Sequence, residues 1–389
     1  MLDAVPGVGA GASLWRSTGM RALIGVTFLG FASYCLTLAS LPTYAVEGGA
    51  AESTAGVVTA VFLVVTIAVQ SVVPALTARF GTGPVLAAGL VAMGLPSPLY
   101  LLDDGVAWIS ALSAVRGAGF AILTVLGATL SAWVAPPGRR GESIGLYGLA
   151  IAIPNMVAVP AGVALVLAGH VGWLSWLSAS PLLGLVLVPL LMRSVTVPPD
   201  LGGSGSNRAA ALAALAPSAV LFVVTMAGGG LVTFLPIERP DGRLATIALL
   251  LWGATGALSR WRAGLLADRL GAALLLPLAV AVGAVGLALV AVGLGTGDVW
   301  VLIGAAVFGA GFGAVQNLTL LTSFARAGEQ GQTAASATWN AAFDAGTAVG
   351  ALALGVLAGG LGLGGTFVLV AAGLALLVPL ARAAGQVSR

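Results

Sequence analysis

The sequence predicts an all-α polytopic membrane protein with twelve transmembrane helices in two pseudo-symmetric six-helix bundles. Of its 389 residues, 59% are hydrophobic and only 7% are charged, whereas about 25% of residues are charged in a soluble domain. The mean hydropathy is +1.08, and apolar runs recur along the whole length. Because so little polar surface is available, lipid must be the solvent for most of the chain.

Twelve runs approach the roughly 20 apolar residues that a membrane-spanning helix needs. The longest break between them, residues 193–211, is rich in Pro, Gly and Ser and predicts a flexible cytoplasmic linker. It would separate an N-terminal six-helix bundle, residues 1–192, from a C-terminal one, residues 212–389. The predicted spans are residues 20–45, 55–78, 83–102, 106–134, 143–168, 173–192, 212–236, 244–261, 272–294, 299–325, 333–359 and 366–383.

The arginines fall unevenly on the two sides that alternating spans would create. All sixteen basic residues are arginine, and with the N-terminus inside, thirteen of them lie in inner segments or at the inner ends of spans. Only Arg239 and Arg243 lie in outer segments, and Arg116 lies within a span. Because cytoplasmic loops carry the excess of positive charge, both termini are predicted to be cytoplasmic, which agrees with an even number of spans.

The two halves of the chain repeat one another. GAGF at 117–120 recurs at 309–312, and the Leu-Pro pair at 41–42 recurs at 235–236. Leu, Arg and Gly at 76, 79 and 81 recur at 266, 269 and 271. Three matches in order, at nearly one offset of half the length, indicate an internal duplication. Six spans plus six spans is an architecture of transporters that rock two bundles about a central site.

The residue types exclude several kinds of chemistry. Cys35 and His170 are the only cysteine and the only histidine, so a thiolate or imidazole metal site lacks ligands, and we expect neither metal nor cofactor. The arginines are scattered singly, which does not favour nucleic-acid binding. An integral-membrane enzyme would need a nucleophile, base or metal cluster at a membrane face, and none is evident, so we expect no catalytic residues.

The segment between the eighth and ninth spans carries the most specific motif. GLLADRLG at 264–271 resembles the cytoplasmic loop motif G-x-L-a-D-r-x-G of the major facilitator superfamily. The first-half counterpart, PALTARFG at 74–81, has Pro74 and Ala78 where Gly and an acid are usual. Repeat geometry would place Asp268 at the inner N-terminus of the fifth helix, where the helix dipole favours an acid. The resemblance implies the major facilitator fold and conformational roles for Arg79, Arg260, Gly264, Asp268, Arg269 and Gly271.

Two further segments refine the resemblance. Arg116 followed by GAGF is similar to the Arg-containing fourth helix of the family, and ATWNAAFDAGTAVG at 337–350 is similar to the eleventh helix of bacterial efflux-type members. The chain thus resembles a bacterial twelve-helix, drug- or sugar-efflux-like transporter. That resemblance implies a monomer in the bacterial cytoplasmic membrane that handles a small-molecule substrate.

Arg116 and Asp344 are the ionisable residues deepest within the predicted spans. Each is about ten residues from a span end, where a charge costs about 2.5–3.5 kcal/mol on insertion scales. Arg116 is expected to line the central cavity; the alternative is a structural pair with a backbone carbonyl. Asp344 is the best candidate for proton coupling, because a desolvated carboxylate takes up a proton more readily. Its alternative is a hydrogen bond that serves helix packing.

Uncharged polar residues at similar depth are candidates for substrate contact, because side-chain amides and hydroxyls can donate and accept hydrogen bonds. The alternative for each is an interhelical hydrogen bond. These candidates are Tyr34, Asn155, Gln316, Asn317 and Asn340.

The leading hypothesis is a secondary active transporter that exports a small organic molecule by alternating access, coupled to protons. Its partners would be the substrate, protons and the lipid bilayer, with no nucleic acid. Many drug exporters of the family have an acid in the first span, which this chain lacks, so a facilitator or an importer of the same fold is the alternative. A non-transporting membrane receptor is a more distant one.

Overall fold

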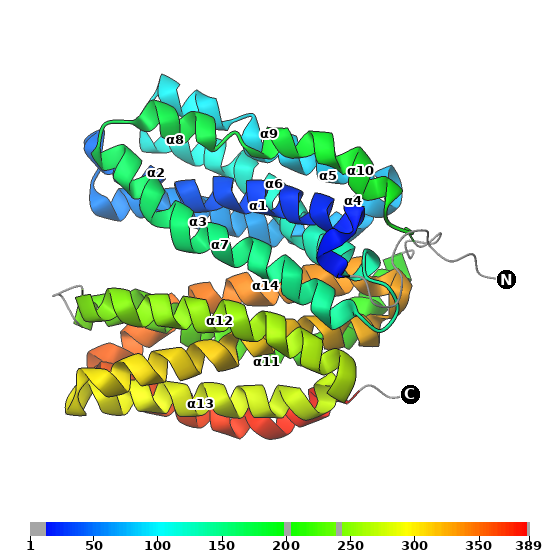
Figure 1. The fold of residues 1–389 in the computed structure, drawn as a ribbon. Helices are drawn as coiled ribbons and strands as arrows, with labels where there is room; N and C mark the ends of the chain where they lie inside the picture. Colours follow the sequence, from blue (N-terminus) through cyan, green and yellow to red (C-terminus); the bar gives the residue numbers. More distant parts are fainter. Residues whose placement is uncertain (1–12, 198–203, 239–242, 387–389) are drawn as a thin grey trace. The chain divides into compact units, whose positions relative to one another are not determined.

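The computed structural model describes residues 13–197, 204–238 and 243–386. Throughout these ranges every regular element is a helix (Figure 1). Contacts divide the chain into a first unit, residues 1–137 and 150–201, and a second unit, residues 138–149 and 202–389. Part of the predicted linker (198–203) and Arg239 lie outside the described residues, and the division at 193–211 stays a prediction.

In the first unit, the described residues begin with a short 3₁₀ turn, η1 (Leu14–Arg16), which is followed by helices. α1 (Thr18–Leu38) and α2 (Ser40–Glu47) form one stretch, and α3 (Glu52–Gln70) bends by 54° into α4 (Val73–Phe80). The rest are α5 (Thr82–Gly94), η2 (Ser97–Leu102), α6 (Val106–Trp133), α7 (Arg140–Leu167), α8 (Val171–Leu177), α9 (Pro181–Gly184), η3 (Leu185–Leu187) and α10 (Val188–Arg193). α7 contributes to both units, because residues 140–149 group with the second unit.

The second unit has four long elements, and α14 packs along the other three. They are α11 (Ser204–Glu238), α12 (Arg243–Leu270), α13 (Ala272–Thr296) and α14 (Asp298–Gly385). The backbone of α14 leaves helical geometry at Gly328 (φ 70°, ψ 175°) and at Gly362 (φ 68°, ψ 166°). A side chain would be strained at such positive φ values, so these glycines divide α14 into the last three predicted spans.

Helix length and hydropathy support the membrane assignment. In the described ranges, eight helices are long and apolar enough to cross a bilayer, or nine if the bent pair α3–α4 is one span. The number is smaller than twelve because α14 is counted once, and because α12, with Arg260 inside its apolar stretch, is not among the eight. Large apolar side chains such as Leu352 and Val356 are 74% and 82% exposed, as expected of surfaces that face lipid.

The internal repeat is visible in backbone geometry. Gly81 separates α4 from α5 at φ 83° and ψ 155°, and Gly271 separates α12 from α13 at φ 82° and ψ 148°. The motif glycine is therefore required for the same reason in both halves: the chain turns through a conformation that side chains rarely adopt.

Packing repeats as well. Gly117 of α6 lies against the backbone oxygen of Phe62, and Gly309 of α14 lies against that of Trp252. A methyl group at either glycine would overlap the neighbouring helix, so both halves need a glycine at this contact.

Candidate functional site

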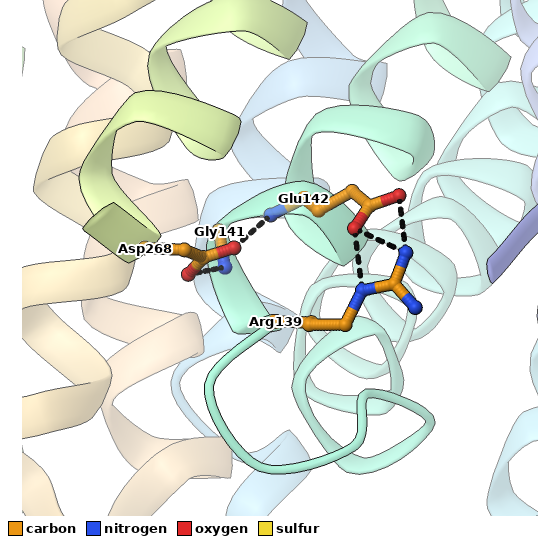
Figure 2. A network of polar contacts seen from close by, with 4 residues as sticks. All are labelled: Arg139, Gly141, Glu142 and Asp268. Carbon is orange, nitrogen blue, oxygen red and sulfur yellow. Dashed lines mark hydrogen bonds and ion pairs between the residues drawn. The ribbon is translucent and has the colours of Figure 1, made fainter. Parts of the chain in front are cut away.

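The Asp268 carboxylate caps the N-terminus of α7 (Figure 2). Its two oxygens accept hydrogen bonds from the backbone N–H groups of Gly141 (2.8 Å) and Glu142 (2.9 Å). The first N–H groups of a helix have no partner within the helix, and the helix dipole favours a negative charge there. Asp268 thus lies where the repeat geometry placed it. We call these two hydrogen bonds the latch.

Two ion pairs surround the latch. Arg139 contacts Glu142 at 2.7 Å, and both side chains are partly buried. Arg140 contacts Glu329 on α14 at 2.8 Å, where Glu329 is 72% exposed. The exposed pair contributes little to stability, so the latch depends chiefly on Asp268.

Burial raises the pKa of the Asp268 carboxyl above its ordinary value, and the two backbone N–H donors offset part of that rise. The neighbouring Glu142 carboxylate raises the pKa slightly further, and Arg139 lowers it slightly. Desolvation disfavours the charged form, whereas hydrogen bonds to the carboxylate favour it. The latch therefore holds its charge in a partly desolvated position.

Three glycines of α7 let it lie directly against α12. Gly141 meets the backbone of Gly264, Gly145 meets that of Trp261, and Gly148 meets the Arg260 side chain. This spacing of three and four residues places small residues on one helix face, which permits close helix contact. These glycines were not among the residues predicted for the site, although their spacing along α7 was a usable signal. Their contact gives Gly264 of the motif a steric reason to be glycine.

Beneath this contact lies a polar group that we call the Arg260 cluster: Arg260, Gln316, Asn317 and Tyr147. Arg260 is only 7% exposed and donates from Nη1 to Gln316 Oε1 at 2.8 Å. Its guanidinium carbon is 5.9 Å from the centroid of the Tyr147 ring. Asn317 donates from Nδ2 to the carbonyl oxygens of Gly141 (3.1 Å) and Arg260 (3.0 Å). The structure thus brings together residues that the sequence placed in two separate groups.

The Arg260 guanidinium is only partly satisfied. In the part of the chain that the structure describes, Nε and Nη2 are buried without a hydrogen-bond partner. Asp344 on α14 is partly buried and interacts electrostatically with Tyr147. A buried guanidinium with open donors can bind an anionic group.

Arg116 is placed quite differently. It is 1% exposed, and all three guanidinium nitrogens donate hydrogen bonds. Nε donates to the Met93 carbonyl (3.0 Å), Nη1 to the Tyr100 hydroxyl (3.4 Å), and Nη2 to the Ser33 carbonyl (3.1 Å) and hydroxyl (2.9 Å). This geometry favours the structural alternative, a cation held by backbone carbonyls, over a cavity-lining role for this residue.

Tyr34 lies in an aromatic cluster of the first unit. Its ring stacks on Phe120 (4.2 Å between centroids) and on Phe62 (5.4 Å). Tyr34 also lines a small pocket of about 20 Å³ together with Thr37, Thr59, Ser113 and others. That volume accommodates about one water molecule, so Tyr34 borders a void but no ligand-sized chamber.

Several other candidates lie apart from these groups. Asn155 is exposed and donates to Ile151 O within its own helix (3.0 Å), and Asn340 donates to Ser336 O (2.9 Å). Arg79 and Arg269 are exposed at the helix ends beside the two motif glycines. Ala78 supplies no carboxylate, so the first copy of the motif cannot form the bonds that Asp268 makes. Within the described part of the chain, no group of three or more His, Cys, Asp or Glu residues is placed to hold a metal ion.

The comparisons with known proteins agree with this architecture. The family model described as Major Facilitator Superfamily matches residues 22–351. This chain belongs to the major facilitator superfamily. It is therefore a multi-pass membrane protein and a secondary transporter of small molecules, and the superfamily is one of transporters, not enzymes.

Solved structures of other superfamily members share the fold. The E. coli fucose:proton symporter superposes with a TM-score of 0.72 at 14% identity, covering 95% of this chain and 98% of that one. A human organic anion transporter gives a TM-score of 0.74 at 14% identity, covering 94% and 99%. Similarity at this level shows the fold alone, and it confirms the all-α prediction. No curated protein matches the sequence significantly.

Proposed function

We propose that this major facilitator transporter exports a small organic molecule from the bacterial cytoplasm in exchange for protons, as a monomer with both termini cytoplasmic. The observation that carries the proposal is the position of Asp344. It lies within the predicted span 333–359 and interacts electrostatically with Tyr147, which belongs to the latched segment of α7. A proton on Asp344 would remove the charge that acts on Tyr147, and this change would in turn alter the contact between α14 and α7.

The latch supplies the conformational part of the proposal. α7 is one continuous helix whose residues 140–149 contact the second unit, whereas residues 150–167 belong to the first. Alternating access rocks one bundle against the other, so the Asp268 bonds would have to break once in each cycle. Loss of the charge at Asp344 and opening of the latch would then be linked through Tyr147.

The test uses purified protein in liposomes with a pH indicator inside. Candidate substrates come first from a screen for thermal stabilisation, because a ligand at 100 times its Kd stabilises by about 2.7 kcal/mol. Adding a transported substrate should move protons opposite to it, and an imposed pH gradient should accelerate flux. Asp344→Asn should retain substrate binding but lose the dependence on the pH gradient, whereas Asp298→Asn, an exposed acid of the same element, should behave like the wild type.

The alternatives predict other results. A facilitator gives downhill flux that is indifferent to the pH gradient, and an importer moves protons and substrate in the same direction. A receptor binds a ligand but gives no flux in well-sealed vesicles. Either of the first two outcomes would replace proton-coupled export while leaving transport intact.

A further inference from the structure

The internal repeat allows the buried Arg260 to be compared with the equivalent position in the first unit. With the offset of 190 residues that relates the two loop motifs, Arg260 of α12 corresponds to Gln70 of α3, and with the 192-residue offset of GAGF, Gln316 corresponds to Thr124. The first unit forms the equivalent hydrogen bond, from Gln70 Nε2 to Thr124 Oγ1 at 3.5 Å. An uncharged amide therefore makes the equivalent hydrogen bond in the first unit, so helix packing at this contact does not require a cation.

The cation in the second unit is unusually costly. Burial of a charge without full pairing is unfavourable by several kcal/mol, and Arg260 is 93% buried with Nε and Nη2 unpartnered among the described residues. Arg116 in the first unit shows that the fold can satisfy every guanidinium nitrogen where an arginine is structural. The open donors of Arg260 therefore indicate a role that this conformation leaves unfulfilled.

Arg260 is covered by residues 140–149 of α7, the segment whose first N–H groups bind Asp268. Tyr147 places its ring against the guanidinium, and Gly148 lies directly over the Arg260 side chain. These residues belong to the segment that Asp268 holds by its first two backbone N–H groups. Opening of the latch would therefore uncover Nε and Nη2, which lie side by side on the planar guanidinium fork that carboxylates and phosphates match.

We propose that Arg260 is an anion-binding residue, and that the transported substrate is an organic anion whose carboxylate or phosphate group binds Nε and Nη2 when the α7 segment lifts. This inference rests on the proposed transport function and specifies its substrate class. Gln316 holds the guanidinium from the opposite side through Nη1, which orients the open edge towards the α7 cover. Neutral substrates could accept hydrogen bonds from this residue but would lack the charge attraction that an anion gains.

The test measures thermal stabilisation of the full-length protein by acetate, benzoate, 2-naphthoate, inorganic phosphate and thiocyanate. Each carboxylate is paired with its neutral amide at equal ionic strength. Arg260→Gln introduces the residue that the first repeat has at this position, and Arg260→Lys retains the charge. Arg262→Gln is the matched control, because it removes an exposed arginine two residues away on the same helix.

We expect at least one anion to stabilise the wild type and its amide not to do so. Arg260→Gln should lower the affinity for that anion by about tenfold to a hundredfold, which is the effect of losing hydrogen bonds from a charged donor. Arg260→Lys should retain part of the affinity and Arg262→Gln all of it. Asp268→Asn should tighten binding, because a weaker latch populates the uncovered state.

The state of the ligand-free variants gives an independent readout. If the charge is unneeded for packing, Arg260→Gln melts at or above the wild-type temperature. A much lower melting temperature would make Arg260 structural and overturn the proposal. So would anion stabilisation that persists in Arg260→Gln, or the absence of stabilisation by any anion.

Flux measurements separate this inference from the transport function. Anion binding at Arg260 without flux in liposomes would retain the binding site and reject transport. Flux of a neutral compound that Arg260→Gln leaves unchanged would retain transport and reject the anion site.

Discussion

Arg116 and Arg260 are both buried, and the hydrogen bonds around them differ. Arg116 donates from every nitrogen to groups on α1, α5 and η2, so it ties three elements of the first unit together. Arg260 has one side-chain hydrogen bond and one aromatic neighbour. At the scale of single residues, the satisfied arginine holds the fold, and the unsatisfied one is available for a ligand.

Replacement of Arg116 should therefore cost stability. Arg116→Gln leaves carbonyl and hydroxyl acceptors buried without their donors, which should lower the unfolding free energy by about 1–3 kcal/mol. Thermal melting in detergent measures this, with Arg262→Gln as the exposed control, expected to change stability by less than about 0.5 kcal/mol. Unchanged melting of Arg116→Gln combined with lost substrate binding would instead support a role in the cavity.

At the scale of elements, α7 is the helix that takes part in most contacts of the site. Its first N–H groups are capped by Asp268, its glycines contact α12, and its Tyr147 covers Arg260. A continuous helix from Arg140 to Leu167 passes any displacement at one end towards the other, although Pro154 and Pro160 each remove one backbone donor along the way. In the proposed transport cycle, the latch would control the position of α7.

The contact of α7 with α12 should tolerate no added methyl group at its closest point. A Cβ at Gly264 would overlap the backbone oxygen of Gly141, so Gly264→Ala should destabilise the protein by about 1–3 kcal/mol. Gly253→Ala is the matched control on the same helix, since nothing lies within 4 Å of the added atom. Equal melting temperatures for the two variants would contradict this contact.

Protonation of Asp268 should stabilise the described conformation. Burial raises the folded-state pKa of this carboxyl above its unfolded value of 3.8, so the folded chain binds more protons between the two values. Stability then falls as pH rises from the unfolded pKa through the folded pKa. The melting temperature of wild type minus that of Asp268→Asn should therefore be larger at pH 4.5 than at pH 7. A difference that is constant or grows with pH would refute this, and Gly253→Ala should follow the wild type at both values.

At the scale of the whole molecule, the distribution of arginine predicts the orientation. Cys35 is fully buried, so single cysteines can be added without removing it. His170 and Pro137 are exposed on loops that are predicted to be outer and inner, respectively. In intact cells, His170→Cys should react with a membrane-impermeant maleimide, whereas Pro137→Cys should react only after permeabilisation. The reverse pattern would invert the topology despite the charge bias.

The sequence by itself determined the membrane class, the helical spans and the superfamily. The membrane class and the spans follow from properties that accumulate along the chain: a bilayer requires long apolar helices, and a duplicated chain repeats its motif at a fixed offset. The superfamily was inferred from the resemblance of GLLADRLG at 264–271 to a known loop motif. The glycines at 81 and 271 stood out in the sequence because they repeat within the same motif, and the structure shows that both occupy a turn with positive φ. The position of Asp268 beside α7 was also foreseeable, since the geometry of the repeat predicts which loop meets which helix.

The tertiary structure alone decided what the buried polar residues do. Arg116 and Arg260 have the same side chain in similarly apolar surroundings along the sequence, and only the acceptors supplied by distant helices distinguish them. Gln316 and Asn317 are adjacent in the chain, yet one binds a guanidinium and the other the backbone of α7. A hydrogen bond depends on its direction and on a few tenths of an ångström in its length. The hydrophobic periodicity of a sequence predicts neither of these quantities.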